Sequence, residues 1–168
     1  MFDFFEDLSF YRTIVDTMSA EGLELKGMES EDLSFIVELG NETEELWLDE
    51  ETKFPFDEDE LERWMRWEDK IGFVLVVDDE RIGFVLISID RTMAEIVAFA
   101  LKEGWRCKGY GKVAMKRVLD KIEERGVGAQ NVCVKSDNKE AIKFYSRLGF
   151  MKGEEVVPMF RGLDDQVK

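Results

Sequence analysis

The sequence contains no histidine, and this absence removes whole classes of chemistry. Without an imidazole, triads of the Ser-His-Asp and Cys-His kinds cannot form, and metal sites that use histidine ligands are excluded. Proton transfer must therefore use Glu, Asp, Tyr, Lys, Cys or water. Cys107 and Cys133 are the only cysteines, which is too few for a disulfide framework, so we expect two reduced thiols and no metal.

Long apolar runs, proline and linker sequences are also scarce. No apolar stretch approaches the roughly 20 residues that span a bilayer, and residues 1–7 lack the basic start of a secretory signal. We therefore expect a cytoplasmic protein without a membrane partner. No repeat and no Gly/Ser-rich linker divides the chain, so residues 1–168 are predicted to form a single domain, with an accessory segment at 1–20 and a core at 21–161.

Positive charge is in short supply, because 23 basic residues stand against 38 acidic ones and give a net charge of −15. Nucleic acid is therefore not expected as a partner, since a phosphate backbone needs a basic face. Residues 21–70 carry 19 acidic and 5 basic side chains, whereas residues 101–125 carry 8 basic and 4 acidic ones. The acidic stretch is either a solvated surface or a site for a cationic partner, and the basic stretch favours an anion.

Hydrophobic periodicity and turn residues predict an alternation of strands and helices. Strands are expected at Leu23–Lys26, Ile71–Val77, Arg81–Ile89, Met93–Leu101, Asn131–Lys135 and Val156–Phe160. Helices are expected at Ser30–Leu39, Asp57–Asp69, Gly111–Arg125 and Lys139–Leu148, with Ser30 capping the first helix and Gly40-Asn41 stopping it. The order β-α-α-β-β-β-α-β-α-β predicts an α+β domain around a mixed central sheet flanked by helices.

A glycine-containing loop, Arg106–Gly111, joins the strand that ends at Leu101 to the strongly amphipathic helix after it. Glycine lets the backbone approach a ligand, and successive N–H groups at a helix N-terminus attract a phosphate. Arg106 and Lys108 are expected to add mobile cations. We therefore predict a diphosphate site, although the same pattern is compatible with a tight loop that binds nothing.

Two other phosphate-binding motifs fit this loop less well. Gly109, Gly111 and Ala114 match the spacing G-x-G-x-x-[GA] of a dinucleotide fingerprint, but that fingerprint begins directly after a strand, and here residues 102–108 intervene. A P-loop requires G-x-x-x-x-G-K-[ST], which the loop does not contain. A nicotinamide cofactor is thus the weaker alternative.

Two ordered motifs resemble those of the GNAT superfamily of acetyl-CoA-dependent N-acetyltransferases. Residues 106–111 match every fixed position of its acetyl-CoA loop, [QR]-x-x-G-x-[GA]. Residues 138–150 resemble its second signature, with Asn138, Ala141, Tyr145 and a closing Gly149-Phe150. The resemblance covers about residues 23–160 and implies the GNAT-type acyl-CoA N-acyltransferase fold. In that fold the fourth and fifth strands splay apart at a bulge, and the pantetheine arm of acetyl-CoA enters the gap.

The resemblance also implies which residues bind the acetyl-CoA co-substrate. Backbone groups at the end of the fourth strand contact the arm, the loop amides hold the diphosphate, and Asn138 contacts the arm from the other side. The predicted cofactor-binding residues are Phe99, Ala100, Leu101, Arg106, Cys107, Lys108, Gly109, Tyr110, Gly111, Lys112 and Asn138. Cys107 is expected to be a bystander in this loop and not a nucleophile, because the family transfers the acetyl group directly.

Tyr145 and Glu95 are the predicted catalytic residues. Tyr145 matches the tyrosine that protonates the departing CoA thiolate in many relatives, and a phenol with an ordinary pKa of about 10 carries that proton at pH 7. The plainer interpretation is an aromatic ring packed near the end of its helix. Glu95 is the only acid in the fourth strand, where relatives often place the base, and simple alternation puts it on the same side as Phe99 and Leu101. A bulge can change this alternation, and a surface glutamate is the alternative.

The predicted function is transfer of the acetyl group of acetyl-CoA to a primary amine of a small molecule, a polyamine or a protein N-terminus. Residues 46–48 and 54–56, with the acidic helix after them, loosely resemble the subgroup that acts on ribosomal-protein N-termini and polyamines. The alternative is a non-catalytic acetyl-CoA-binding regulatory module. The amine and the acyl chain stay open, as does whether Val156–Phe160 pairs in a homodimer or lies in the inner sheet.

Overall fold

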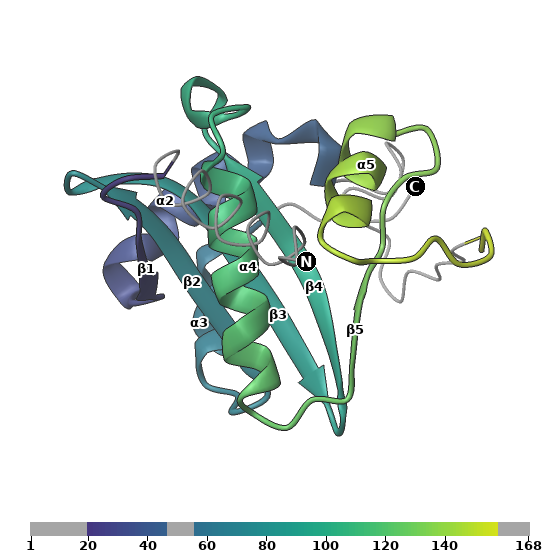
Figure 1. Ribbon diagram of the computed structural model, residues 1–168. Coiled ribbons are helices and arrows are strands. Elements are labelled where there is room, and N and C mark those ends of the chain that lie inside the picture. Colours follow the sequence, from purple (N-terminus) through teal and green to yellow (C-terminus); the bar gives the residue numbers. More distant parts are fainter. Residues whose placement is uncertain (1–19, 47–55, 158–168) are drawn as a thin grey trace, which may run out of the picture.

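A computed structural model gives the structure of residues 20–46 and 56–157 (Figure 1). Its sheet has the order β1-β2-β3-β4-β5. The strands are β1 (Glu24–Gly27), β2 (Lys70–Val77), β3 (Glu80–Asp90), β4 (Met93–Leu101) and β5 (Ala129–Val132). The first four are antiparallel neighbours and β5 runs parallel to β4, so the sheet is mixed, as predicted.

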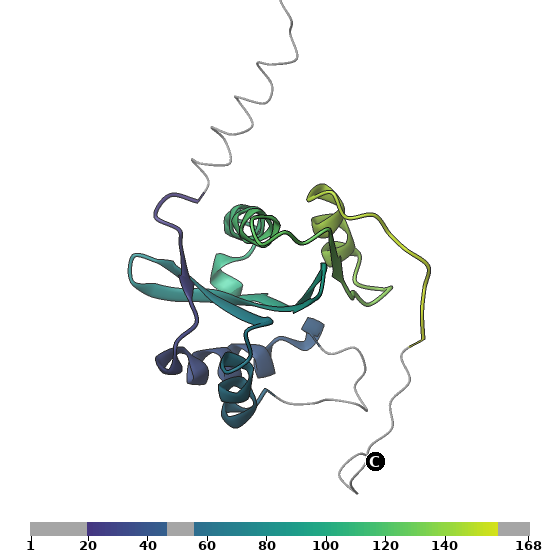
Figure 2. The same ribbon diagram turned by 90° about the horizontal axis from the view of Figure 1, so that it is seen from below.

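Helices cover both faces of the sheet, as the view from below in Figure 2 shows. One face carries α4 (Tyr110–Glu123) and α5 (Lys139–Arg147), and the other carries α2 (Leu33–Glu42) and α3 (Glu58–Met65). Three short 3-10 turns complete the order, namely η1 (Ser30–Asp32), η2 (Glu44–Leu46) and η3 (Glu103–Trp105). In the described ranges, no helix combines the length and hydrophobicity that a membrane crossing requires.

Each face of the sheet buries its own apolar cluster. Leu75 and Val85 lie in the cluster under α4, whereas Val74 and Phe84 lie in the cluster that faces α2 and α3. Successive residues of a strand point to opposite faces, so this alternation decides which cluster each side chain enters.

The predicted order of elements is confirmed from the first strand to the last helix, but the start and end of α2 differ from prediction. Glu29, not Ser30, precedes the first turn, and its N–H donates to Asp32 Oδ2 over 2.9 Å. The helix also passes through Gly40 and ends at Glu42. Gly40 serves packing and does not stop the helix, because a Cβ there would lie 2.7 Å from a ring carbon of Phe56.

Several predictions fall on residues outside the described ranges. These are the accessory segment up to residue 19, residues 47–55 next to the expected acceptor site, and residues 158–160 of the last strand. Val156 and Val157 are described and belong to no strand, with exposures of 80% and 86%, so the predicted strand is wrong at these two positions. Apolar side chains alone were therefore not sufficient to predict a strand at these positions. The homodimer built on this segment stays a prediction.

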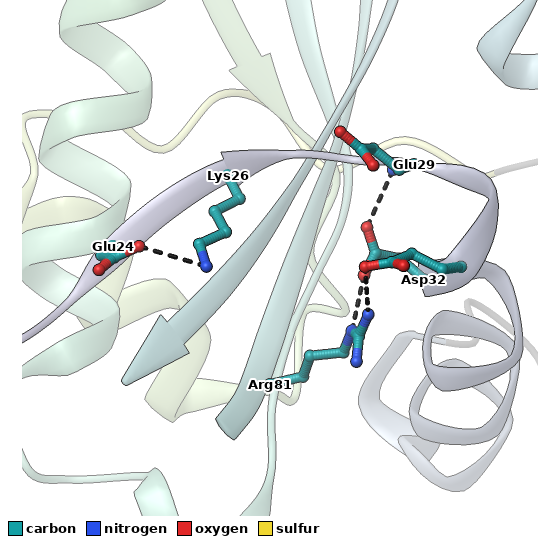
Figure 3. A network of polar contacts seen from close by, with 6 residues as sticks. Glu24, Lys26, Glu29, Asp32 and Arg81 are labelled. Atoms are coloured by element: carbon teal, nitrogen blue, oxygen red, sulfur yellow. Dashed lines mark hydrogen bonds and ion pairs between the residues drawn. The ribbon is translucent and has the colours of Figure 1, made fainter. Parts of the chain in front are cut away.

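A network of charged groups ties the start of β3 to the turn that precedes α2 (Figure 3). The carboxylate of Asp32 is 9% exposed, and its Oδ1 accepts a hydrogen bond from Arg81 Nε over 2.6 Å. The Arg81 guanidinium also lies 3.0 Å from Glu31 Oε1. The hydrogen bond that Arg81 donates to Asp32 is the main cause that raises the pKa of Arg81. Because Asp32 also accepts from the Glu29 N–H, one carboxylate joins two segments that are far apart in the sequence.

A β-bulge interrupts β4 near its middle. Leu86 of β3 pairs with Ala98, whereas the next residue, Ile87, pairs with Ile96, so Val97 is an extra residue in β4. The bulge reverses the alternation of side chains along the second half of the strand.

The strands β4 and β5 part at this bulge, as the resemblance implied. The partners of β5 are Met93–Ile96, and the pairing does not continue into residues 97–101. Strand β5 therefore ends at Val132 and does not reach the predicted Lys135, because β4 no longer lies beside it. Within the described residues, the second half of β4 faces a gap on this side.

Candidate functional site

The loop between β4 and α4 leads into the first turn of α4, where the backbone N–H groups of a helix have no partner within the helix. The chain reaches α4 through two residues in the left-handed region, Cys107 with a φ of 59° and Gly109 with a φ of 90°. Gly109 adopts this φ without the steric cost that a side chain would add. Helix α4 then begins with no side-chain cap and no acidic residue in its first turn. Its first N–H groups, at the positive end of the helix dipole, are thus suited to an anion.

Gly111 allows the first turn of α4 to lie against the end of β4. A Cβ at this position would come within 3.2 Å of Leu101 Cδ1 and 3.3 Å of Phe99 Cζ. Such contacts are tighter than normal van der Waals packing, so glycine suits this close approach. The structure therefore brings the predicted loop and the predicted end of β4 together in one wall of the gap.

The two cations of the loop are placed differently from each other. Arg106 Nε donates to the carbonyl oxygen of Leu101 over 2.9 Å, and Nη1 donates to Glu45 Oε1 over 3.0 Å. The expectation of a mobile cation is wrong for Arg106, because a carbonyl and a carboxylate already hold its guanidinium. Lys108 Nζ lies 5.7 Å from the centre of the Trp105 ring, at the distance of a cation–π contact.

Helix α5 presents an aromatic cluster to the end of β4. The ring of Phe144 stacks on Phe99 with centroids 5.7 Å apart, and Tyr145 packs edge-on against Phe144 and Phe150 at 5.1 and 5.4 Å. Tyr145 is buried, and burial raises the pKa of its phenol above the ordinary value. It therefore keeps its proton at neutral pH, which a general acid requires. Its packing is evident, and its role as an acid stays a prediction.

Asn138 occupies the position just before α5. Its Oδ1 accepts a hydrogen bond from the N–H of Ala141 over 3.0 Å, which caps the helix. The side-chain oxygen is therefore used for capping, while contact of Asn138 with the pantetheine arm stays a prediction.

Glu95 lies on the side of the sheet that faces α2 and α3. It pairs with Ser88 of β3 and Asn131 of β5, and its neighbours in the strand enter the cluster under α4. Phe99 and Leu101, beyond the bulge, also belong with the α4 cluster. The prediction that Glu95 shares a side with these two residues is wrong, because the bulge reverses the alternation.

Three residues near the site were missed by the sequence-based argument. Cys133 Sγ lies 4.0 Å from Glu95 Oε1, and Asn131 Oδ1 is buried without a hydrogen-bond partner among the described residues. Glu45 pairs with Arg106 across 61 positions of the sequence. A polar residue inside a predicted buried strand was a usable signal for Asn131, but no local pattern pairs Glu45 with Arg106.

The arrangement of β4, the loop, α4 and α5 coincides with that of a known family. The model described as the acetyltransferase (GNAT) family matches residues 39–150. The chain belongs to the GNAT family. The matched range includes both motifs on which the sequence resemblance rested, and the α+β GNAT fold predicted from them is confirmed.

Curated relatives of this GNAT chain include acetyltransferases of different names. The mycothiol acetyltransferase of Kytococcus sedentarius is 34% identical over 89 residues, which cover 50% of this chain and 30% of that protein. The ribosomal protein bS18-alanine N-acetyltransferase of Salmonella typhimurium is 24% identical over 100 residues, which cover 58% of this chain and 68% of that protein. The GNAT chain thus spans under a third of the length of the mycothiol enzyme.

Solved GNAT structures share the fold. Spermidine N-acetyltransferase from Vibrio cholerae superposes with a TM-score of 0.68 at 22% identity, covering 83% of this chain and 85% of that chain. AAC(6′)-Iy, in complex with a bisubstrate analogue that contains CoA, gives a TM-score of 0.68 at 18% identity, with 83% and 98% covered. At these identities the likeness establishes the fold alone.

Proposed function

We propose that this GNAT chain is an N-acetyltransferase that moves the acetyl group of acetyl-CoA directly to a primary amine. The observation that carries the proposal is the gap beside the second half of β4. Next to it are the uncapped first turn of α4 and the strand end from Phe99 to Leu101. Phe144 of α5 stacks on Phe99, and the buried Tyr145 packs against Phe144.

The proposed donor site divides into two parts. The N–H groups of the loop and of the first turn of α4 bind the diphosphate, helped by Lys108 and Lys112. The backbone of Phe99, Ala100 and Leu101 binds the pantetheine arm, since among the described residues no strand lies beside this part of β4 on the β5 side. Asn138 faces the arm from the start of α5 in this proposal.

The proposed reaction is a direct transfer. The amine nitrogen attacks the thioester carbonyl carbon, an N–C bond forms, and the C–S bond breaks. A cationic amine loses one proton to Glu95 or to water before the attack, and its nitrogen loses a second proton to water after the N–C bond has formed. The departing thiolate takes one proton from Tyr145, which is reprotonated from water, so that one net proton is released. Since Glu95 lies on the α2 and α3 side of the sheet, this assignment has the amine approach from that side, with Tyr145 on the other.

The proposed acceptor class is a primary amine that is cationic before reaction. The first turn of α3 carries Glu58, Asp59 and Glu60, which would attract such a substrate, although a helix N-terminus favours acidic residues without any ligand. One relative is named for an alanine of a ribosomal protein and one structural neighbour for spermidine. An N-terminal alanine peptide and a polyamine are therefore the first acceptors to test.

A cytoplasmic location is part of this proposal. Cys107 and Cys133 are both exposed and unpaired, and such thiols persist in reducing compartments.

The test of the function is release of the CoA thiol from acetyl-CoA in the presence of each amine, with mass spectrometry of the acceptor. We expect thiol release that depends on the amine and yields a product heavier by one acetyl group. Binding of acetyl-CoA with no turnover on any amine would support the non-catalytic regulatory module instead.

A further inference from the structure

Glu45 lies beside the acyl-donor loop although it belongs to the other side of the sheet. It is in η2, which follows α2 and contacts β4 (Figure 1). A backbone hydrogen bond at Glu45 lowers the pKa of its carboxyl, and the nearby Arg106 and Lys135 lower it further. The carboxylate is therefore ionised at neutral pH. Arg106 precedes α4 and Lys135 follows β5, so the two cations that act on Glu45 come from different segments of the chain.

Two of the five guanidinium N–H groups of Arg106 donate to other groups of the protein. Its Nε–H is directed at the carbonyl oxygen of Leu101, and Nη1 is directed at Glu45. The guanidinium is planar, so these two bonds together fix its orientation. Leu101 is the last residue of β4, and its carbonyl marks the point where the strand becomes the donor loop.

The ion pair of Arg106 and Glu45 contributes too little to fold stability for stability to be its main role. The side chains of Arg106 and Glu45 are 39% and 53% exposed, and an exposed ion pair contributes little to stability because water and salt screen it. The geometry instead joins three parts of the site, namely the end of β4, the loop that leads to α4, and the turn after α2.

We propose that Arg106 is a positioning residue, oriented by Glu45, that holds the end of β4 in the geometry required by the acyl arm, and that its guanidinium does not bind the diphosphate. This inference rests on the proposed acetyltransferase function for its kinetic consequences, but its structural core does not depend on turnover. It makes Glu45 a residue of the site that acts through Arg106.

Hydrogen exchange on the ligand-free full chain tests the structural core. Arg106→Ala and Glu45→Gln are expected to speed exchange of the amides of residues 101–106 by about tenfold, the effect of losing roughly one net hydrogen bond to a charged group. Glu155→Gln is the matched control, because it breaks an exposed pair, with Lys152, of the same 3.0 Å length outside this segment. Unchanged exchange at residues 101–106 in Arg106→Ala would overturn the proposal.

Two acetyl donors, one with and one without a diphosphate, distinguish a positioning role of Arg106 from direct binding of the diphosphate. A positioning role predicts that Arg106→Ala lowers kcat/KM by a similar factor for acetyl-CoA and for acetyl-pantetheine, which lacks the diphosphate. Glu45→Gln is also expected to lower kcat/KM for both acetyl donors. A loss confined to acetyl-CoA, or tighter acetyl-CoA binding in Glu45→Gln, would show that the guanidinium serves the diphosphate and would overturn the inference. Failure of wild-type chain to acetylate any amine would contradict the proposed function only, since the exchange experiment still decides the positioning role.

Discussion

Single side chains of the site are surrounded by residues that lie far away in the sequence. Local sequence patterns therefore do not predict their contacts. Tyr145 was predicted from its motif, and the structure adds that it is buried between Phe144 and Phe150 with a raised pKa. Arg106 was also predicted from its motif, and the structure adds that its guanidinium donates to Leu101 and Glu45. Contacts between distant residues decide such details.

Removal of the Tyr145 hydroxyl tests its role as an acid. In Tyr145→Phe we expect kcat to fall by about 10²–10³-fold, the usual effect of losing a general acid, while acetyl-CoA binding stays within a few-fold. Steady-state thiol release and calorimetry measure the two quantities. Ser146→Ala is the matched control, because it removes the neighbouring exposed hydroxyl, which donates only to the carbonyl of Ile142. A Tyr145→Phe enzyme with wild-type kcat would leave Tyr145 as a packing residue.

At the scale of elements, the sequence was sufficient for the order of strands and helices but not for their register. Apolar periodicity located β2, β3, β4 and α4 closely, since each has a long and regular pattern. The bulge at Val97 has no such pattern, and it alone reversed the side expected for Glu95. The end of β5 depends on the departure of β4, so it too was not predictable from β5 itself.

The close approach of β3 and β4 leads to a prediction about stability. A Cβ at Gly83 would overlap the carbonyl oxygen of Ala100 and the side chain of Leu101. Gly83→Ala is therefore expected to cost about 1–3 kcal/mol of unfolding free energy, as overpacking typically does, and to weaken acetyl-CoA binding because the end of β4 must move. Urea unfolding measures the first effect. Gly27→Ala on β1, where a Cβ would meet nothing within 4 Å, is the control, and equal losses in both variants would contradict the account.

For the whole molecule, the two-faced sheet would let one chain present the proposed donor site and the proposed acceptor side together. Helices α4 and α5 form the face with the loop and Tyr145, while α2 and α3 cover the face to which Glu95 belongs. In the proposed reaction, the substrates meet where β4 and β5 part. This architecture favours the proposed transfer of the acetyl group from a donor on the α4 and α5 face to an amine on the α2 and α3 face.

The buried phenol of Tyr145 makes the unfolding free energy of the molecule depend on pH in the alkaline range. Below the ordinary tyrosine pKa of about 10, Tyr145 is protonated in both folded and unfolded chains and adds no pH dependence. Above it, the unfolded chain releases a proton that the folded chain keeps, so unfolding becomes easier as pH rises. We expect the unfolding free energy of wild type to fall more steeply above pH 10 than that of Tyr145→Phe, measured by urea titration. Parallel curves would show that the folded phenol titrates normally.

The most direct measurement of the central claim is calorimetric titration of the full chain with acetyl-CoA, CoA and NADH. We predict that both CoA compounds bind and that NADH does not. We also predict that Gly109→Trp abolishes binding, because a side chain at a φ of 90° strains the loop before the first turn of α4, while circular dichroism shows an intact fold. Absence of binding at millimolar acetyl-CoA in the folded wild-type chain would contradict the acetyltransferase assignment of this site.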